Sequence, residues 1–540
     1  MPEKTNFNTQ QKKALLAELI LAGDFDLKTY QQIIKKFPSF DHKIFSKSEL
    51  IAQAKTDKVS AELIAKMQMK PTRTMSGVTP VTVLTKPWPC PGKCIFCPTD
   101  VRMPKSYLKD EPGAQRAFSH RFSPYDQVAS RLRALQEIGH PTDKVELIIL
   151  GGTWSFYPEE YQIWFVRECF RALNTWLPSP QAKPTGEGRG VRWIDLEAEQ
   201  KINETAPSRC VGLVIETRPD YISEAEVIKI RRLGATKVQI GVQSLNDQVL
   251  QKNQRGHSVA ATAKAFALLR QAGFKIHAHW MANLYGATPE ADQRDFKKLF
   301  SVNFRPDELK IYPCSLIKSA ELYDYYLKKL WQPYDYQELL SVMTFVLQRT
   351  PRYCRITRMI RDFSSHDIEV GNKKTNFRQI AEDQLKKIGQ SSPEIRAREI
   401  RSHKFAPTQI KFKTTKYQTR VSQEYFLEYM TADDKLLAFL RLSLPTQLNF
   451  IPELKNTAMI REIHVYGPAL KIGQTNLDQA QHLGLGKKLI ARAQTIAIKN
   501  NFKKIAVISA VGTREYYRKQ GFRSGQLYQH LNLPFQSVRA

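Results

Sequence analysis

Apolar positions in the central part of the chain follow two alternating spacings. Six short runs consist mainly of apolar and β-branched residues, as expected for parallel strands that are buried on both faces. These runs are residues 78–85, 145–150, 211–217, 237–244, 275–281 and 308–313. Between them, apolar residues recur every three or four positions, the spacing of amphipathic helices, with glycine near the helix ends. The alternation predicts a parallel sheet, for which a partial (β/α)6 barrel is the favoured arrangement and a doubly wound open sheet the alternative.

Both ends of the chain differ from this central region. Residues 1–72 show helical spacing with interleaved lysines, which predicts a basic helical region. Residues 351–420 are polar and contain 17 Lys+Arg against 7 Asp+Glu, which predicts a basic linker with a folded surface. From residue 421 onward, apolar runs, a glycine-rich turn and a helix indicate a second α/β domain. We therefore expect four parts, with the boundaries 1–72, 73–350, 351–420 and 421–540.

The chain is strongly basic. Its 540 residues include 82 Lys+Arg and 52 Asp+Glu, a net charge of +30. Such a surface attracts polyanions, so nucleic acid is the first candidate partner and an anionic membrane the second. A basic surface that meets only solvent is the remaining explanation. Hydrophobic residues make up 42% and charged residues 25%, values that exclude a disordered or collagen-like chain.

The sequence shows neither a membrane-spanning segment nor a signal peptide. No apolar run approaches the ~20 residues of a spanning helix, and the polar N-terminus lacks the apolar core of a signal peptide. We therefore expect a cytoplasmic protein with no membrane partner and no disulfide framework. Four of its seven cysteines are scattered and are predicted to be small buried hydrophobes. These are Cys169, Cys210, Cys314 and Cys354.

The other three cysteines form a cluster just after the first apolar run. Cys90, Cys94 and Cys97 have the spacing C-x3-C-x2-C, close enough for one soft metal centre. Zinc usually takes four ligands, whereas a 4Fe–4S cluster held by three cysteines keeps one iron free for a substrate. Structural zinc is the alternative. The motif resembles that of the radical S-adenosylmethionine (SAM) enzymes, and this resemblance implies a 4Fe–4S cluster and SAM as cofactors.

Two further features lie where a barrel enzyme places its reaction site. Gly151 and Gly152 follow the second apolar run, and Gln243 ends the fourth. The carboxyl ends of barrel strands face the reaction site, so we predict that these three residues contact SAM. A tight turn after a strand is the alternative for the two glycines.

A glycine motif opens the last long helix. Gln481, Gly484, Leu485, Gly486 and Lys487 belong to the stretch QHLGLGKK, in which glycines expose backbone N–H groups at a helix start, the chemistry of a pyrophosphate site. A Rossmann dinucleotide site is the poorer interpretation, because the full G-x-G-x-x-G motif and its acidic partner are missing. The stretch EYYRKQGF follows. Together these stretches resemble the GNAT acetyltransferase fold, which implies acetyl-CoA as a ligand.

The combination of the two motifs in one basic chain resembles the catalytic subunit of Elongator. The resemblance extends from about residue 70 to the end and is most specific in LGGTW, IETRPD, AMIREIHVYG, GLGKKL and ISAVGTREYYRKQGF. It implies a tRNA-modifying acyltransferase that makes 5-carboxymethyluridine at the wobble position, with acetyl-CoA as the source of two carbons. The electron donor, the oligomeric state and the identity of the tRNAs are left open.

The resemblance also assigns roles to individual residues. Tyr516 and Tyr517 are the catalytic candidates. The acetyl-CoA residues are Glu462, Ile463, His464, Val465, Gln481, Gly484, Leu485, Gly486, Lys487 and Tyr517. The predicted tRNA-binding parts are the basic region 1–72 and, in the linker, Arg396, Arg398, Arg401 and Lys404, as generic phosphate contacts. Relatives carry a lysine where Glu159 stands here and a zinc-associated cysteine where Ala397 stands, so no zinc is predicted.

Other functions remain possible from the sequence. A protein lysine acetyltransferase with a structural iron–sulfur domain is the main alternative, although a basic surface would repel cationic protein tails. A methylthiotransferase needs further cysteines before Cys90, and none is present. A non-catalytic tRNA-binding scaffold leaves both cofactor motifs unexplained. For the acetyl group to reach the cluster, we expect the C-terminal domain to dock against the barrel mouth, the end formed by the strand carboxyl termini.

Overall fold

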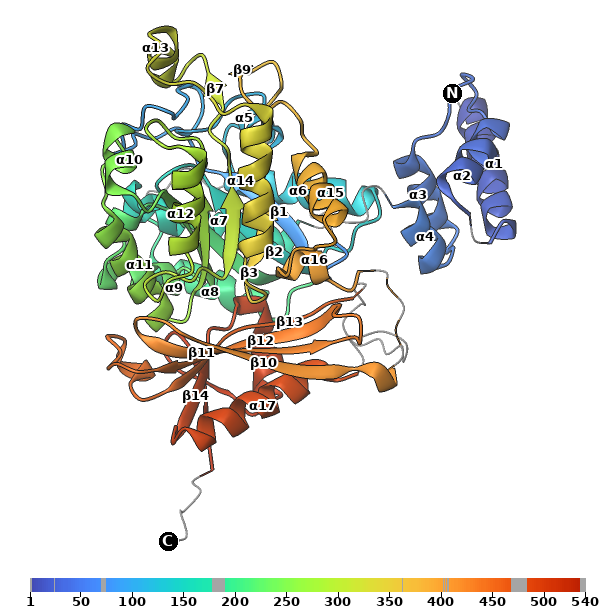
Figure 1. The fold of residues 1–540 in the computed structure, drawn as a ribbon. Coiled ribbons are helices and arrows are strands. Elements are labelled where there is room, and N and C mark those ends of the chain that lie inside the picture. Colours follow the sequence, from blue (N-terminus) through green and yellow to red (C-terminus); the bar gives the residue numbers. More distant parts are fainter. Residues whose placement is uncertain are drawn as a thin grey trace.

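The chain folds into a helical N-terminal lobe, a central barrel and a C-terminal sheet domain beneath the barrel (Figure 1). This arrangement comes from a computed structural model. It describes residues 2–23, 25–68, 74–176, 190–361, 363–401, 403, 405, 407–467 and 483–534. In this part of the chain, no helix combines the length and apolar character needed to cross a bilayer.

The N-terminal lobe is helical, as predicted. Its helices are α1 (Pro2–Leu21), α2 (Leu27–Lys36), α3 (Lys47–Thr56) and α4 (Ala61–Met67). They enclose a small core of their own that includes Leu15, Leu19 and Leu50. Lys55 Nζ donates to the carbonyl of Gln136 at 2.7 Å, which links the lobe to the barrel. Binding of tRNA by this lobe stays a prediction.

The barrel contains all six predicted strands, together with a seventh. The strands are β1 (Thr79–Leu84), β2 (Lys144–Leu150), β3 (Arg209–Thr217), β4 (Lys237–Gln243), β5 (Lys275–Trp280), β6 (Glu308–Ile311) and β8 (Arg355–Arg358). They lie in the order β1-β2-β3-β4-β5-β6-β8, and every neighbouring pair is parallel. This order follows the chain without reversal, so the partial barrel is confirmed and the doubly wound alternative is wrong.

Helices cover the outside of the barrel (Figure 1). They are α5 (Pro112–Ser119), α6 (Pro124–Glu137), α7 (Glu159–Thr175), α8 (Trp193–Asn203), α9 (Glu224–Arg232), α10 (Asp247–Lys252), α11 (Val259–Gln271), α12 (Pro289–Lys298), α13 (Leu322–Leu327) and α14 (Tyr336–Arg349). A short ribbon of β7 (Leu316–Ile317) and β9 (Ile368–Val370) lies at the mouth end.

The predicted basic linker is part of both neighbouring domains. Strand β8 completes the barrel sheet, and Cys354, just before the strand, and Ile356, within it, are fully buried. The helices α15 (Phe377–Lys387) and α16 (Ile395–Arg398) follow, and the C-terminal sheet already begins at Lys411. The segment looked like a linker because β8 has only one buried side chain among three basic or polar ones. Ladder hydrogen bonds with β6 hold it in the sheet.

The C-terminal domain is one seven-stranded sheet with two helices. Its strands are β10 (Lys411–Gln418), β11 (Ser422–Met430), β12 (Leu436–Pro445), β13 (Ala458–Val465), β14 (Lys504–Val507), β15 (Arg523–Ser524) and β16 (Gln529–Asn532), and its helices are α17 (Leu485–Lys499) and α18 (Arg514–Arg518). Only β13 and β14 pair in parallel, and they do so over just three residue pairs, from Ala458 with Ile505 to Ile460 with Val507. Beyond Ile460 the two strands separate, so one edge of β13 faces an opening instead of a neighbouring strand.

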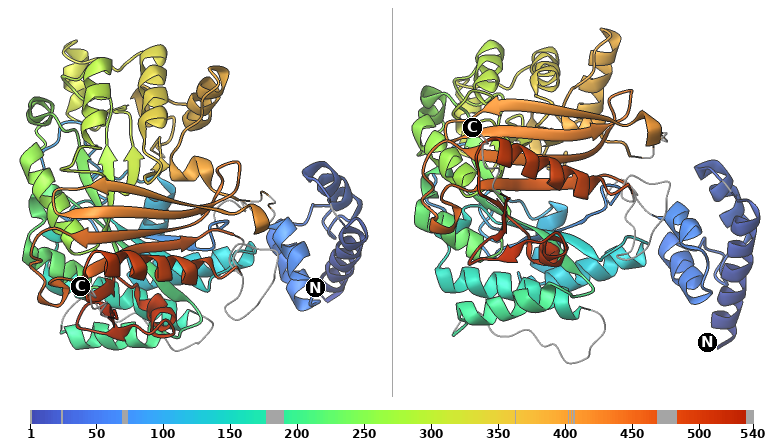
Figure 2. Two further views of the ribbon diagram at one scale, coloured as in Figure 1. Left: turned by 60° about the horizontal axis from the view of Figure 1, so that its bottom comes forward. Right: turned by 90° about the horizontal axis from the view of Figure 1, so that it is seen from below.

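The C-terminal domain docks against the barrel floor, the end formed by the strand amino termini (Figure 2). Tyr528 Oη donates to the carbonyl of Ala272 at 2.8 Å, just before β5. Arg231, at the end of α9, donates to the carbonyl of Ser509 at 2.8 Å. The expected docking against the mouth is therefore wrong. Charged and polar groups at the strand starts hold the domain at the floor.

A buried group of charges joins the two domains. The carboxylate of Asp307, immediately before β6, lies 3.0 Å from Arg270, 2.7 Å from Arg461 and 3.4 Å from Arg441. Arg441 and Arg461 belong to the C-terminal sheet, and all four side chains are at most 2% exposed. Ion pairs this well buried and multiply bonded fix the relative position of the domains.

Candidate functional sites

The three motif cysteines face one cavity at the barrel mouth. The cavity has a volume of about 170 Å³, and Cys90, Cys94 and Cys97 line it together with Gly152 and Gln243. The sequence motifs thus converge, because the loop after β1 and the carboxyl ends of β2 and β4 meet there. We call this space the cluster cavity.

The three motif cysteines suit an iron–sulfur cluster. Arg255 Nη1 donates to Cys94 Sγ at 3.5 Å, a positive partner for a thiolate. Burial raises the pKa of the Cys97 thiol to about 12, so this sulfur ionises only when something binds it. Within the described residues, no three His, Cys, Asp or Glu side chains stand close enough to hold a single ion. A 4Fe–4S cluster attaches each cysteine to a separate iron, so three thiols that line one cavity fit it.

The predicted SAM residues differ in their positions. Gly152, with φ of +91°, and Gln243, with φ of +66°, both line the cluster cavity. Gly151 does not line it. A Cβ at Gly151 would lie 1.7 Å from Thr85 Oγ1, so close packing in a turn with φ of +143° already requires glycine there. The turn interpretation therefore accounts for Gly151.

Several residues of the cluster cavity were not predicted from the sequence, namely His279, Lys310 and Cys314. Glu216, at the end of β3, also lines it and accepts a hydrogen bond from Tyr107 Oη at 3.0 Å. The signal was available, because β4 to β6 place polar residues at alternate positions that would be apolar in a filled barrel. The four scattered cysteines are buried as predicted, and Cys314 is one of them.

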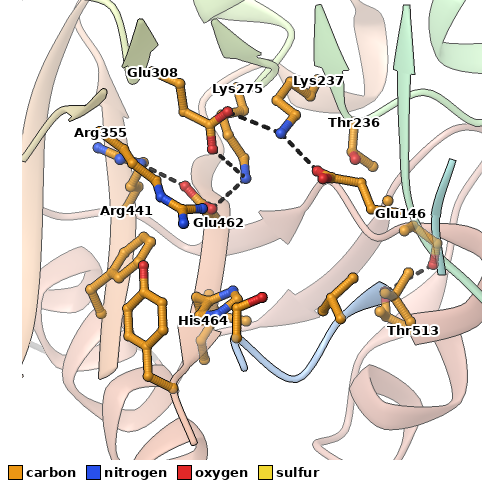
Figure 3. A pocket seen from close by; sticks show the side chains of 18 of the residues that line it. Glu146, Thr236, Lys237, Lys275, Glu308, Arg355, Arg441, Glu462, His464 and Thr513 are labelled. Carbon is orange, nitrogen blue, oxygen red and sulfur yellow. Dashed lines mark hydrogen bonds and ion pairs between the residues drawn. The ribbon is translucent and has the colours of Figure 1, made fainter. Parts of the chain in front are cut away.

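A second cavity, of about 540 Å³, lies between the barrel floor and the C-terminal sheet. Five residues predicted from the C-terminal motifs line this floor cavity: Glu462, Ile463, His464, Tyr516 and Tyr517. Residues from the strand starts of the barrel, among them Lys237, Lys275 and Glu308, line its other side. Figure 3 shows Lys275 and Glu308 of the barrel pointing toward Glu462 of the C-terminal sheet across the domain boundary.

The glycine motif and the tyrosines meet at one point. Gly484 caps α17 with φ of +63° and offers no side chain, so among the described residues the N–H groups of the first turn have no side-chain acceptor. A Cβ at Gly486 would lie 2.8 Å from Tyr516 Oη and 3.7 Å from Val465 Cγ2. The start of α17, the end of β13 and Tyr516 therefore lie side by side, an arrangement that suits a pyrophosphate with an acyl arm along β13.

Other predicted acetyl-CoA residues have distinct positions. Leu485 is buried in the domain core, so only its backbone is available to a ligand, whereas Lys487 is exposed. Gln481 lies outside the described residues. Tyr517 is buried, and burial raises the pKa of its phenol far above the ordinary value. It therefore stays protonated and can act only as a proton donor at neutral pH.

His464 is the half-buried imidazole of the floor cavity. Its ring lies against Tyr466, with centroids 4.4 Å apart, and its Nε2 has no hydrogen-bond partner among the residues that the structure describes. Burial lowers the pKa of His464 to about 4, so the ring is neutral at pH 7. A neutral imidazole with one free nitrogen can accept a proton or orient a water molecule.

Ion pairs organise the barrel side of the floor cavity. Lys237 Nζ lies 2.7 Å from Glu146 and 2.9 Å from Glu308 (Figure 3). Lys275 bridges Glu308, at 3.5 Å, and Glu462 of the C-terminal sheet. The cavity therefore has charged walls from both domains, which sequence motifs in one domain could not indicate.

The linker arginines were predicted to bind tRNA, and for Arg398 this is wrong. Its side chain is buried and lies 2.8 Å from Glu428 and 3.0 Å from Asp434. Arg396 donates to the carbonyl of Thr357 at 2.5 Å and, like Arg401, lines the floor cavity. Lys404 lies outside the described residues. A dense run of arginines resembles a phosphate site because sequence does not show which carboxylates fold against it.

We predict that Arg398→Met destabilises the fold without changing the salt dependence of tRNA binding. The substitution leaves the fully buried Glu428 with Arg352 as its remaining partner, so it should cost about 3 kcal/mol. Thermal unfolding and the slope of log Kd against log salt concentration measure the two effects. Arg401→Met, at an exposed position, is the control and should leave the melting temperature unchanged. A lower salt slope in Arg398→Met would contradict the structural role.

Comparisons with known proteins agree with this geometry. Residues 90–299 match the radical SAM superfamily and residues 306–387 the Radical_SAM C-terminal domain. The chain is 39% identical to the tRNA uridine(34) acetyltransferase of Dehalococcoides mccartyi over 86% of this chain and 100% of that relative. It is 34% identical to Elongator complex protein 3 of Homo sapiens over 85% of each chain. A solved structure of Methanocaldococcus infernus Elp3, with an N-terminal deletion of 1–46, is 35% identical, with a TM-score of 0.72 over 85% of this chain and 99% of that one.

The barrel, its cysteine loop and the matched models define a radical SAM protein. Proteins of this superfamily use a 4Fe–4S cluster and SAM. More particularly, the chain belongs to the family of the tRNA uridine(34) acetyltransferases and Elongator complex protein 3. The resemblance noted in the motifs is thereby confirmed.

Proposed function

We propose that the chain is a tRNA-modifying acyltransferase that makes 5-carboxymethyluridine at the wobble uridine of tRNA, with SAM and acetyl-CoA as co-substrates. The observation that carries the proposal is the presence of two cavities on one barrel. The cluster cavity is lined by the radical SAM cysteines, and the floor cavity is lined by four residues of the predicted acetyl-CoA site. Relatives named tRNA uridine(34) acetyltransferase support the substrate.

The cluster cavity supports the radical half of the reaction. Cys90, Cys94 and Cys97 would hold the 4Fe–4S cluster, which supplies the electron that cleaves SAM to an organic radical. Gly152 and Gln243 would contact SAM beside it. Arg255 adds positive charge against the sulfur ligands, and the surrounding barrel wall excludes water from the radical.

The floor cavity supports the acyl half. The N–H groups at the start of α17 would bind the pyrophosphate, and the free edge of β13 would bind the pantetheine amides. Neutral His464 would orient a water molecule toward the thioester, and protonated Tyr517 would donate to the leaving sulfur. Basic barrel residues, among them Lys237 and Lys275, line the side of this cavity that faces the floor, which disfavours the lysine acetyltransferase alternative because they would repel a cationic protein tail.

The test is a reaction with tRNA, SAM, reductant and [¹⁴C-acetyl]-CoA under anaerobic conditions. We expect label to appear in the wobble nucleoside as carboxymethyluridine, with one 5′-deoxyadenosine formed per product. We also expect acetyl-CoA to be consumed only when tRNA is present, since idle radical formation would damage the protein. Product formed without acetyl-CoA would overturn the proposal.

We predict that Gly486→Val removes acetyl-CoA binding. The new side chain would collide with Tyr516 Oη and cover the first-turn N–H groups, so affinity should fall at least about tenfold. Equilibrium binding of acetyl-CoA measures the loss, and iron content should stay at the wild-type level. Ala491→Val, on an exposed position of the same helix, is the control for the β-branched side chain. Wild-type carboxymethyluridine formation by Gly486→Val would contradict this assignment.

A further inference from the structure

The two cavities lie at opposite ends of the barrel, yet they share its inward-facing strand positions. On β6, Glu308 lines the floor cavity and Lys310 lines the cluster cavity. These residues are two apart, a separation of about 7 Å along a strand. The partition between the cavities is therefore only one layer of side chains thick at this point.

Gln239 on β4 and His277 on β5 belong to this layer. Each lies midway between a residue of the floor cavity and a residue of the cluster cavity on its own strand. Both side chains are buried, and His277 Nε2 bonds to Thr357 Oγ1 at 2.9 Å. Burial holds the pKa of His277 well below its ordinary value. The His277 imidazole and the Gln239 amide are therefore both neutral at pH 7.

The side-chain amide of Gln239 lies in this layer, and its shape resembles that of a small carboxylate. Its Oε1 accepts from Lys310 Nζ at 2.5 Å and lies 3.0 Å from His279 Nε2, which donates in the appropriate tautomer. Among the described residues, no carboxylate pairs with Lys310. A half-buried ammonium group with only a neutral amide as acceptor is a ready site for an anion. Acetate has the size and the two acceptor oxygens to replace the amide there.

We propose, on the basis of the proposed function, that acetate released in the floor cavity crosses to the cluster cavity past Gln239 and is bound there by Lys310. Hydrolysis in the floor cavity adds a water oxygen to the acyl carbon and breaks the C–S bond. One water proton goes to the CoA sulfur and the other to solvent, leaving acetate as the anion. Lys237 and Lys275 on the floor side, and Lys310 on the mouth side, provide cations along the route.

The passage of acetate is tested by changing the size of the side chain at position 239. Gln239→Phe should leave acetyl-CoA hydrolysis within about twofold of wild type but lower the ratio of label in tRNA to free labelled acetate at least about tenfold. Gln239→Met has similar volume to the native residue and is the matched control, which should keep most of the ratio. A wild-type ratio in Gln239→Phe would overturn the proposal. Thermal melting confirms that each variant is folded.

The role of Lys310 is tested by measuring acetate binding, which does not require the iron–sulfur cluster. Broadening of the ¹³C signal of labelled acetate by the full chain should weaken at least about tenfold in Lys310→Met. Lys318→Met, at an exposed surface position, should bind as wild type does. Equal acetate binding by Lys310→Met and wild type would overturn the proposal. This test decides the question even if Gln239→Phe fails to fold. A wild-type chain that binds acetate but never makes carboxymethyluridine would instead refute the proposed function.

Discussion

Cys94→Ala should give a folded chain that contains no iron–sulfur cluster and makes no carboxymethyluridine. Two remaining thiols cannot hold a 4Fe–4S cluster with one open iron. Iron content and the brown absorbance should fall to near zero, and SAM cleavage should fall with them. The affinity for tRNA should stay within about twofold, because polyanion binding depends on surface charge and the substitution changes none.

Cys314→Ala is the matched control for this prediction. Its thiol lines the same cavity from outside the motif loop and could serve as a fourth protein ligand. If three cysteines hold the cluster, Cys314→Ala keeps its iron and its absorbance. Full iron content in Cys94→Ala would contradict the cluster assignment. Loss of iron in both variants would indicate a four-ligand metal site.

Asp307→Asn should separate or unfold the two domains. The carboxylate lies within 3.4 Å of three buried arginines, two of them from the C-terminal sheet. The amide keeps the shape but leaves three guanidinium groups without their shared anion, so the cost should be about 3–5 kcal/mol. Thermal unfolding measures the loss, and Asp433→Asn, at a half-exposed surface carboxylate, is the control. A melting temperature equal to wild type would show that other contacts hold the interface.

The same carboxylate predicts a pH dependence. Burial alone would raise the pKa of Asp307, but Arg270, Arg461 and Arg441 outweigh it and hold the pKa well below its ordinary value. Its stabilising contribution is therefore present above the unfolded-state pKa of about 3.9 and is lost as the pH falls below it. Unfolding free energy should decrease more steeply between about pH 5 and pH 2 in wild type than in Asp307→Asn. Parallel pH profiles would contradict the assigned ion pairs.

The sequence by itself determined the element order and the chemistry of the motifs. Short β-rich runs, several of them nearly all apolar, marked the strands β1 to β6 because strands of a parallel sheet are buried on both faces. The spacing of Cys90, Cys94 and Cys97 was informative because ligands close in sequence are close in any fold. The stretch from Gly484 to Gly486 was informative for the same reason, since a helix start is a local structure.

Only the tertiary structure decided how distant segments meet. Docking of the C-terminal domain at the barrel floor depends on Asp307, Arg441 and Arg461, whose partners are more than 100 residues apart and carry no local pattern. Arg398, at the end of α16, appeared to be a surface residue because Glu428, the carboxylate that neutralises it, belongs to the distant strand β11. The one-layer partition at Gln239 exists because strands starting far apart in the chain share one register, which hydrogen bonds across the sheet impose.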